Sequence, residues 1–116
     1  MNLKASITLA TLMILSPLAG AQDAASCGEQ PVEPTIVDGA ASTFEQLIAN
    51  GKEVNAYIAE ADQFLDCSEA RYIRISGSRI HKDILGEQIK SLTTRHNEIG
   101  DELNAQVAAY QAANPQ

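Results

Sequence analysis

Residues 44–72 read FEQLIANGKEVNAYIAEADQFLDCSEARY, and the spacing of their apolar and small side chains predicts an amphipathic helix. Nine such positions span 28 residues in eight steps, an average of 3.5 residues per step, which matches one face of a helix and not the alternation of a strand. They are Phe44, Leu47, Gly51, Val54, Ile58, Ala61, Leu65, Ser68 and Tyr72. The dipeptide Asn50-Gly51 is typical of turns. The apolar positions keep the same helical spacing before and after this dipeptide, so we expect one continuous helix.

A second helix is predicted after the first, with eight stripe positions that span 25 residues in seven steps. They are Leu85, Ile89, Leu92, His96, Ile99, Leu103, Val107 and Tyr110. Between the helices, Gly77 can take the left-handed conformation that ends a helix, and Ser78 can cap the next one. We therefore expect a helical hairpin over residues 42–113 and a short tail at 114–116, where Asn114-Pro115 ends the pattern.

The segment before the hairpin, residues 22–41, is expected to be an extended arm. Its prolines with polar spacers favour extended chain, and Asp38-Gly39 favours a turn. The first helix is predicted to begin near Ser42, because both Ser42 with Glu45 and Thr43 with Gln46 fit the spacing of a capping box.

The two cysteines, Cys27 and Cys67, predict one intramolecular disulfide if the chain is exported to an oxidising compartment. The helix from residue 42 to Cys67 would be about 38 Å long. The arm back to Cys27 reaches up to about 50 Å, so it can run along the helix and be pinned there. Closing this loop would contribute about 4 kcal/mol through the unfolded state. The alternatives are an intermolecular bridge, or a lipidated Cys27 with a free Cys67.

The N-terminus has the order of a secretory signal: the basic Lys4, an uncharged stretch over residues 5–21, and small residues before the predicted cleavage after Ala21. A proline interrupts the stretch, which is shorter than the roughly 20 apolar residues of a spanning helix. The sequence therefore predicts a signal peptide at 1–21 and localisation in the periplasm, with secretion beyond it as a further possibility. A retained membrane anchor and lipidation of Cys27 are the alternatives.

The remaining 95 residues carry seven bases and fifteen acids, a net charge of −8. Such a chain is not a general binder of nucleic acids or anionic membranes, and no stable membrane insertion is expected after signal removal. Two helices bury little apolar surface, so a third layer is needed. The fold predicted is all-α: an antiparallel helical hairpin with a disulfide-tethered arm. With five aromatic residues in the chain, we expect self-association into a four-helix bundle, with the arm as the alternative third layer.

Charge is unevenly distributed along the chain. Residues 22–69 carry −9, residues 70–96 carry +4 and residues 97–116 carry −3. One interpretation is that the basic region pairs with acids within the hairpin or end to end in a dimer. The other is that the basic turn, which also contains Ile73, Ile75 and Ile80, contacts an acidic partner or lipid headgroups.

The sequence predicts no catalytic residue, no cofactor and no metal site. His81 and His96 would lie about 22 Å apart on one helix, so they cannot share a metal ion within one chain. Motifs for covalent haem, zinc proteases, phosphate loops and serine hydrolases are absent from the sequence. His96 is either a packed core residue or a pH switch. An acidic cluster is either a solvated helix face or a site for a hard cation; it comprises Glu98, Asp101 and Glu102.

Three segments together carry a resemblance to a known family: 27–38 (CGEQPVEPTIVD), 57–67, and 95–97 continued through 104–110. The chain resembles an uncharacterised family of short exported Gram-negative bacterial proteins. They share a signal peptide, a cysteine near prolines, a helix ending near a second cysteine, and a closing helix that ends around an aromatic residue. The resemblance implies export, the disulfide and helicity, and it implies no functional residues.

Three functions follow as hypotheses. The leading one is a non-enzymatic interaction or structural protein of the envelope, which binds another protein or itself. The second is a ligand-binding or chaperone-like protein that holds an apolar or cationic molecule between the helices or in a dimer groove. The third, an enzyme or metal protein, would need His96 and acidic groups from two chains to meet at a dimer seam.

Overall fold

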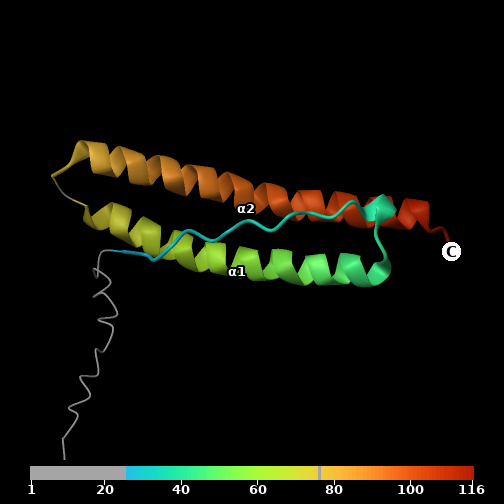
Figure 1. Cartoon of the computed structure of the whole chain (residues 1–116). Coiled ribbons are helices and arrows are strands. Elements are labelled where there is room, and N and C mark those ends of the chain that lie inside the picture. The colour runs from blue at the N-terminus through green and yellow to red at the C-terminus, as the bar shows by residue number, and fades with distance from the viewer. Residues whose placement is uncertain (1–25, 76) are drawn as a thin grey trace, which may run out of the picture.

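Two long antiparallel helices, joined by a tight turn, make up most of the computed structural model, which describes residues 26–75 and 77–116 (Figure 1). The first helix, α1, spans Phe44–Arg74, and the second, α2, spans Arg79–Ala113. A single turn of 3-10 helix, η1 (Gly39–Ala41), precedes α1. The predicted all-α helical hairpin is confirmed. The predicted signal cleavage after Ala21 lies outside the described residues.

Local side-chain chemistry sets the ends of the helices. The capping box at the start of α1 is the one formed by Thr43 and Gln46. Thr43 Oγ1 accepts from the Gln46 N–H at 3.2 Å, and Gln46 Oε1 accepts from the Thr43 N–H at 2.8 Å. At the turn, Gly77 has a φ of +105°, which favours glycine. Ser78 Oγ then accepts from the His81 N–H at 3.4 Å as the N-cap of α2. The helix continues unbroken through Gly51, as its apolar phase predicted.

The arm, residues 26–41, runs back along the seam between the two helices (Figure 1). The Cys27–Cys67 disulfide ties its start to α1, with 5.7 Å between the Cα atoms. Eight residues further on, the Thr35 carbonyl accepts from Asn50 Nδ2 at 2.7 Å. The arm thus passes 17 residues of α1 in eight of its own, because an extended residue advances about 3.1 Å and a helical one about 1.5 Å. The predicted return of the arm to Cys67 is confirmed.

Polar side chains from both helices satisfy the backbone of the arm. Asn50, which is only 3% exposed, accepts from the Val37 N–H at 3.1 Å in addition to its bond to Thr35. On α2, Gln106 Oε1 accepts from the Gly39 N–H at 2.8 Å. An extended segment without a strand partner needs such acceptors and donors when it is packed against helices. Asn50 therefore fixes the arm, although its sequence context resembled a turn.

The close packing of η1 on α2 requires glycine at position 39. A Cβ atom there would lie 1.8 Å from the Gln106 carbonyl oxygen and 2.7 Å from its carbonyl carbon. Both atoms belong to the backbone of α2, so they cannot rotate away as a side chain would. Gly39 lets the two backbones meet and brings its own N–H to the Gln106 side chain.

A charged contact also joins the arm to α2. Arg95 donates from Nε to one Glu33 oxygen at 3.1 Å and from Nη2 to the other, and it also contacts Glu98 at 2.8 Å and Glu102 at 3.0 Å. The hydrogen bonds from Arg95 lower the pKa of Glu33, and those to the three carboxylates raise the pKa of Arg95. Burial raises the pKa of the neighbouring Tyr57, and the Glu33 charge adds to this effect.

The hydrophobic core lies along the facing stripes of the two helices, with Ile36 of the arm packed against it. Its buried members are Val54, Tyr57, Ala61, Leu65, Leu92 and Ile99. Most of the predicted stripe positions face this core or its edge. One prediction was wrong: Phe44, placed on the buried face by its phase, is 57% exposed. The arm covers one side of the seam at that end, and no described element covers the side on which Phe44 lies.

Candidate functional site

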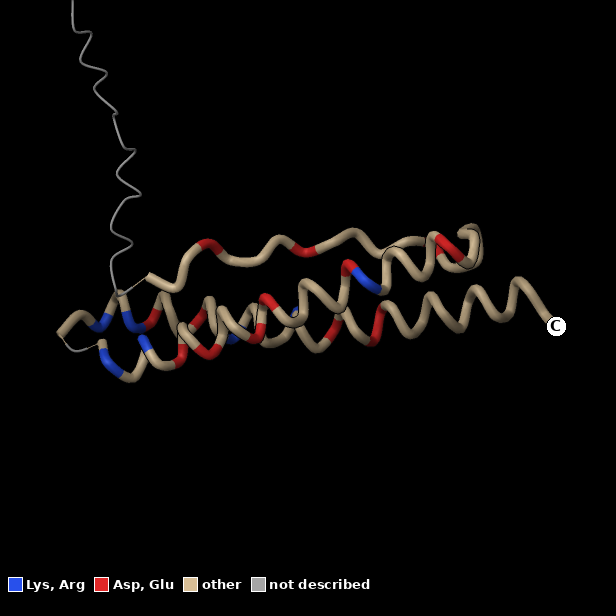
Figure 2. The backbone as a smooth tube through the Cα atoms, turned by 90° about the horizontal axis from the view of Figure 1, so that it is seen from below, with Lys and Arg blue, Asp and Glu red and all other residues tan. Residues whose placement is uncertain are grey.

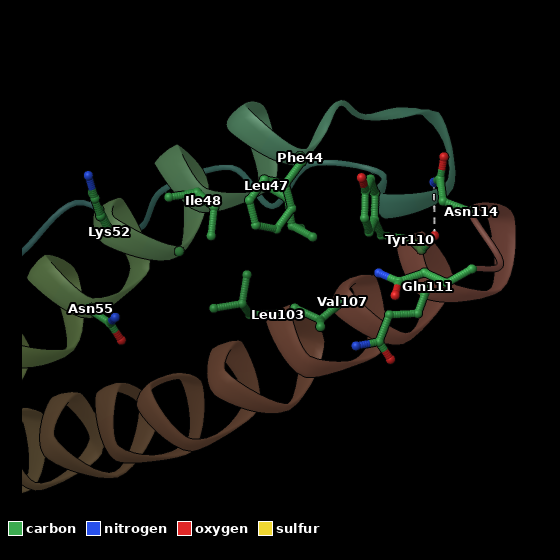
Figure 3. A pocket seen from close by; sticks show the side chains of 12 residues that line it. Phe44, Leu47, Ile48, Lys52, Asn55, Leu103, Val107, Tyr110, Gln111 and Asn114 are labelled. Atoms are coloured by element: carbon green, nitrogen blue, oxygen red, sulfur yellow. Dashed lines mark hydrogen bonds between the residues drawn. The ribbon is translucent and has the colours of Figure 1, made fainter.

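An apolar groove lies between the first turns of α1 and the last turns of α2, at the open end of the hairpin (Figure 3). Its volume is about 820 Å³. Hereafter it is called the groove. Its lining residues are Phe44, Leu47, Ile48, Gly51, Lys52, Asn55, Leu103, Val107, Tyr110, Gln111, Asn114 and Gln116.

The periodicity of both helices explains why these side chains converge. Leu47 forms the base of the groove and is 6% exposed, since it lies on the stripe that faces α2. Phe44 and Ile48 lie beside that stripe and remain 57% and 46% exposed. From α2, the Tyr110 ring lies 6.1 Å from the Phe44 ring at a tilt of 43°, a favourable geometry for an aromatic pair. The groove is therefore a preformed apolar surface that water still contacts.

The arm determines which side of the hairpin stays open. Its contacts with α1 and α2 use Asn50, Arg95 and Gln106, and none of these lines the groove. Phe44 and Ile48 point away from this side, into the groove (Figure 3). The disulfide and the polar contacts of the arm thus complete one side of the seam and leave the other available for binding.

The groove is nearly without charge in a strongly acidic protein. Lys52 is the only charged side chain among its described lining residues, and Asn55, Gln111 and Asn114 supply the polar rim. Residues 103–116, which include the end of α2, contain no charged side chain. A negatively charged partner is therefore repelled less at this end than over the rest of the acidic surface.

Most of the lining residues are apolar or uncharged. The described lining residues contain no histidine, cysteine, serine, aspartate or glutamate, and the titratable side chains among them are Lys52 and Tyr110. Over residues 26–75 and 77–116, no group of three or more His, Cys, Asp and Glu side chains is placed to hold a metal ion. What the groove can do is remove apolar surface of a ligand or partner from water.

The two histidines singled out by sequence lie apart from the groove. His81 is exposed in the first turn of α2. His96 is 22% exposed, and its Nε2 lies 2.8 Å from Asp62 Oδ1, although the ring nitrogen makes no aligned hydrogen bond. The interpretation of His96 as a core residue or a pH switch stays a prediction.

The acidic cluster is divided by Arg95. Glu98 and Glu102 both pair with this arginine, while Asp101 is exposed and takes part in no ion pair among the described residues. Two of the three carboxylates thus help to position the residue that holds Glu33 of the arm. Glu98 and Glu102 are therefore part of the attachment of the arm, whereas Asp101 is not.

Several important residues escaped sequence reasoning. Asn50 and Gln106 are polar residues next to the apolar stripes. Apart from that position, nothing in the neighbouring sequence indicates that they contact the arm. Ile48 was not placed on any face, although it is three residues before Gly51 and four after Phe44. That spacing would have marked a second apolar side of α1.

Comparisons with protein-family models, curated proteins and solved structures return no match. The resemblance to short exported proteins therefore stays a prediction. In the described part of the chain, neither helix has the length and apolar character needed to cross a bilayer.

Proposed function

We propose that this chain is an exported, non-enzymatic interaction protein of the bacterial envelope, and that the groove binds the same groove of a second copy. The observation that carries the proposal is the pair of exposed apolar side chains, Phe44 and Ile48, at the open end of the hairpin. Burying both in an interface would contribute about 1–2 kcal/mol per side chain, since each is about half exposed at present.

The charge distribution favours a second copy as the occupant. Two chains of net charge −8 repel one another over most of their surfaces. They can meet at little electrostatic cost through the uncharged segment 103–116 and the groove, whose one charged lining residue is Lys52. Antiparallel overlap of these ends would place the basic turns at the two outer ends, and it would form a local four-helix bundle. Such a pairing is isologous, because each groove contacts its equivalent.

The small side chains around the groove favour a helix as the partner element. Gly51 has open space where a Cβ would lie, so another backbone can approach α1 there. On α2, residues 105, 108, 109, 112 and 113 are all alanine; they lie between the lining residues in the sequence and do not themselves line the groove. A helix of a second copy can thus pack closely while Phe44 and Ile48 insert beside it.

The test is the native mass of the exported protein, purified without reductant, at micromolar concentrations. Wild type is expected to be two chains, and Ile48→Glu is expected to be one, since a buried carboxylate without a partner opposes association. Ile73→Glu is the matched control, because Ile73 is 79% exposed at the opposite end of the hairpin, and it should remain two chains. A strictly monomeric wild type would overturn the pairing of the two grooves. A pulldown from envelope extract that also returns no reproducible partner would overturn the interaction role as well.

The volume of the groove favours one further candidate, a carrier of an apolar small molecule. About 820 Å³ lies within the range of about 300–1,000 Å³ typical of ligand sites. The aromatic pair and the polar rim suit an elongated apolar ligand. Mass spectra of the protein under native conditions distinguish the two. A co-purified small molecule that is lost in Ile48→Glu would favour the carrier, and a two-chain species without added mass would favour the dimer.

A further inference from the structure

The turn end of the hairpin, residues 71–82, concentrates positive charge; hereafter it is called the tip. It contains Arg71, Arg74, Arg79 and Lys82 and no acidic residue. Figure 2 shows this basic group at the end of the molecule where the two helices join. Within residues 26–75 and 77–116, none of the four takes part in an ion pair. Lys82 Nζ lies 4.7 Å from the centroid of the Tyr72 ring, and the three arginines are exposed. Acidic side chains within the hairpin therefore do not neutralise the tip.

The same end exposes three large aliphatic side chains. Ile73 is 79% exposed, Ile80 is 71% exposed and Ile84 is 54% exposed. They lie on both sides of the turn and alternate with the basic residues. Exposed isoleucines beside unpaired arginines are typical of a surface that meets the interface of a bilayer, where aliphatic side chains enter the acyl boundary and cations stay at the phosphates.

We propose that the tip docks on an anionic lipid surface, with Ile73 and Ile80 in the interface and the three exposed arginines of the tip against lipid phosphates. The other described residues carry three bases and fourteen acids, a net charge of −11. An anionic surface repels this body and attracts the tip. The hairpin therefore stands end-on, because charge interactions decay over about 10 Å and only the tip comes that close.

The isoleucines distinguish a lipid surface from an acidic protein. An acidic protein, including a second copy of this chain, would pair with the arginines but would place Ile73 and Ile80 against charged and hydrated side chains. A bilayer accommodates the isoleucines and the basic side chains together, because its acyl boundary and its phosphates lie at depths that differ by a few ångströms. The tip lies at the opposite end from the groove, so this proposal is independent of dimerisation.

A single tryptophan provides the sharpest test, since the chain has none. Ile80→Trp places the probe at the tip, and Ile48→Trp places the same probe in the groove as the matched control. The protein recovered after export is mixed with vesicles of phosphatidylglycerol and phosphatidylethanolamine, or of phosphatidylcholine alone. We expect a blue shift and quenching by brominated lipid for Ile80→Trp with the anionic vesicles only. Equal quenching of both probes, or none at the tip, would overturn the proposal.

Charge variants then separate the tip from overall charge. Arg74→Gln with Arg79→Gln should weaken vesicle binding about 25-fold, at about fivefold for each cation near the surface. Lys90→Gln is the matched control for Arg74→Gln alone: it removes one positive charge from the body, outside the groove, and should weaken binding less than about twofold, against about fivefold for Arg74→Gln. Arg74, Arg79 and Lys90 are all exposed, so folding is retained, and circular dichroism checks this. Equal losses in Arg74→Gln and Lys90→Gln would refute a role for the tip. If the arginine variants of the tip no longer form dimers but still bind vesicles, the tip contacts an acidic protein and not lipid.

Discussion

Replacing Gly39 with alanine should markedly destabilise the domain, because the new methyl group would collide with the backbone of α2. The Cβ would lie 1.8 Å from the carbonyl oxygen of Gln106, whereas distances under 3.0 Å are essentially never seen for real Cβ atoms. The backbone of α2 at Gln106 is held by the helix and cannot move to relieve the clash, so η1 must move away from α2. That displacement also breaks the 2.8 Å hydrogen bond from the Gly39 N–H to Gln106 Oε1.

The magnitude follows from these two effects. Overpacking at a well-packed contact costs about 1–3 kcal/mol, and the lost hydrogen bond about 0.5–1.5 kcal/mol. The sum, about 2–4 kcal/mol, is a large share of the roughly 5–15 kcal/mol that stabilises a typical domain. For a domain of this size, it should lower the melting temperature by about 10 °C or more.

Gly100→Ala in α2 is the matched control, because the same change is made outside the groove, where a Cβ would meet open space. Alanine in a helix interior should raise the free energy of unfolding by about 0.5–1 kcal/mol. Urea unfolding followed by circular dichroism, with the disulfide intact in both variants, measures the two effects. The free energy of unfolding should fall in Gly39→Ala and rise in the control variant. If Gly39→Ala unfolds at the same urea concentration as wild type, the close approach of η1 to α2 is refuted.

Three further predictions concern the attachment of the arm. Cys27→Ser with Cys67→Ser should lower the free energy of unfolding by about 2–4 kcal/mol, measured by urea unfolding; an unchanged midpoint would show that the tether does not restrict the unfolded chain. Asn50→Ala leaves two backbone groups of the arm without partners and should cost about 1–3 kcal/mol, with faster amide exchange in the arm, and exchange as slow as in wild type would contradict this role. Because Arg95 lowers the pKa of Glu33, this carboxylate stabilises the fold above its ordinary pKa, and the effect is lost as pH falls through the lowered value. The difference in unfolding midpoint between wild type and Glu33→Gln should therefore close in acid, and a difference that stays constant with pH would exclude the ion pair.

Periodicity and spacing were sufficient to predict the hairpin and to narrow the start of α1 to two candidate capping boxes, and the cysteine count with expected export predicted the disulfide. Each of these depends on residues that are close in sequence, or on a length that can be compared with a helical rise. The Cys27–Cys67 pairing, for example, required only that the arm be long enough to return along α1.

The path of the arm could not be predicted in the same way. Gly39 and Gln106 are 67 residues apart, and nothing local to either position indicates their contact. The exposure of Phe44 has the same origin, since its phase on α1 is that of a core residue and only the position of the arm leaves its side uncovered. The groove is thus a consequence of where a third element packs, which helix periodicity does not encode.

The central claim is that the groove is an interface between two copies of this chain, and photocrosslinking in the producing cells tests it most directly. A photoreactive amino acid at position 48 should yield an adduct of two chains, whereas the same residue at position 73 should not. An adduct from position 73 alone, or none from position 48 while the protein is monomeric, would contradict the claim.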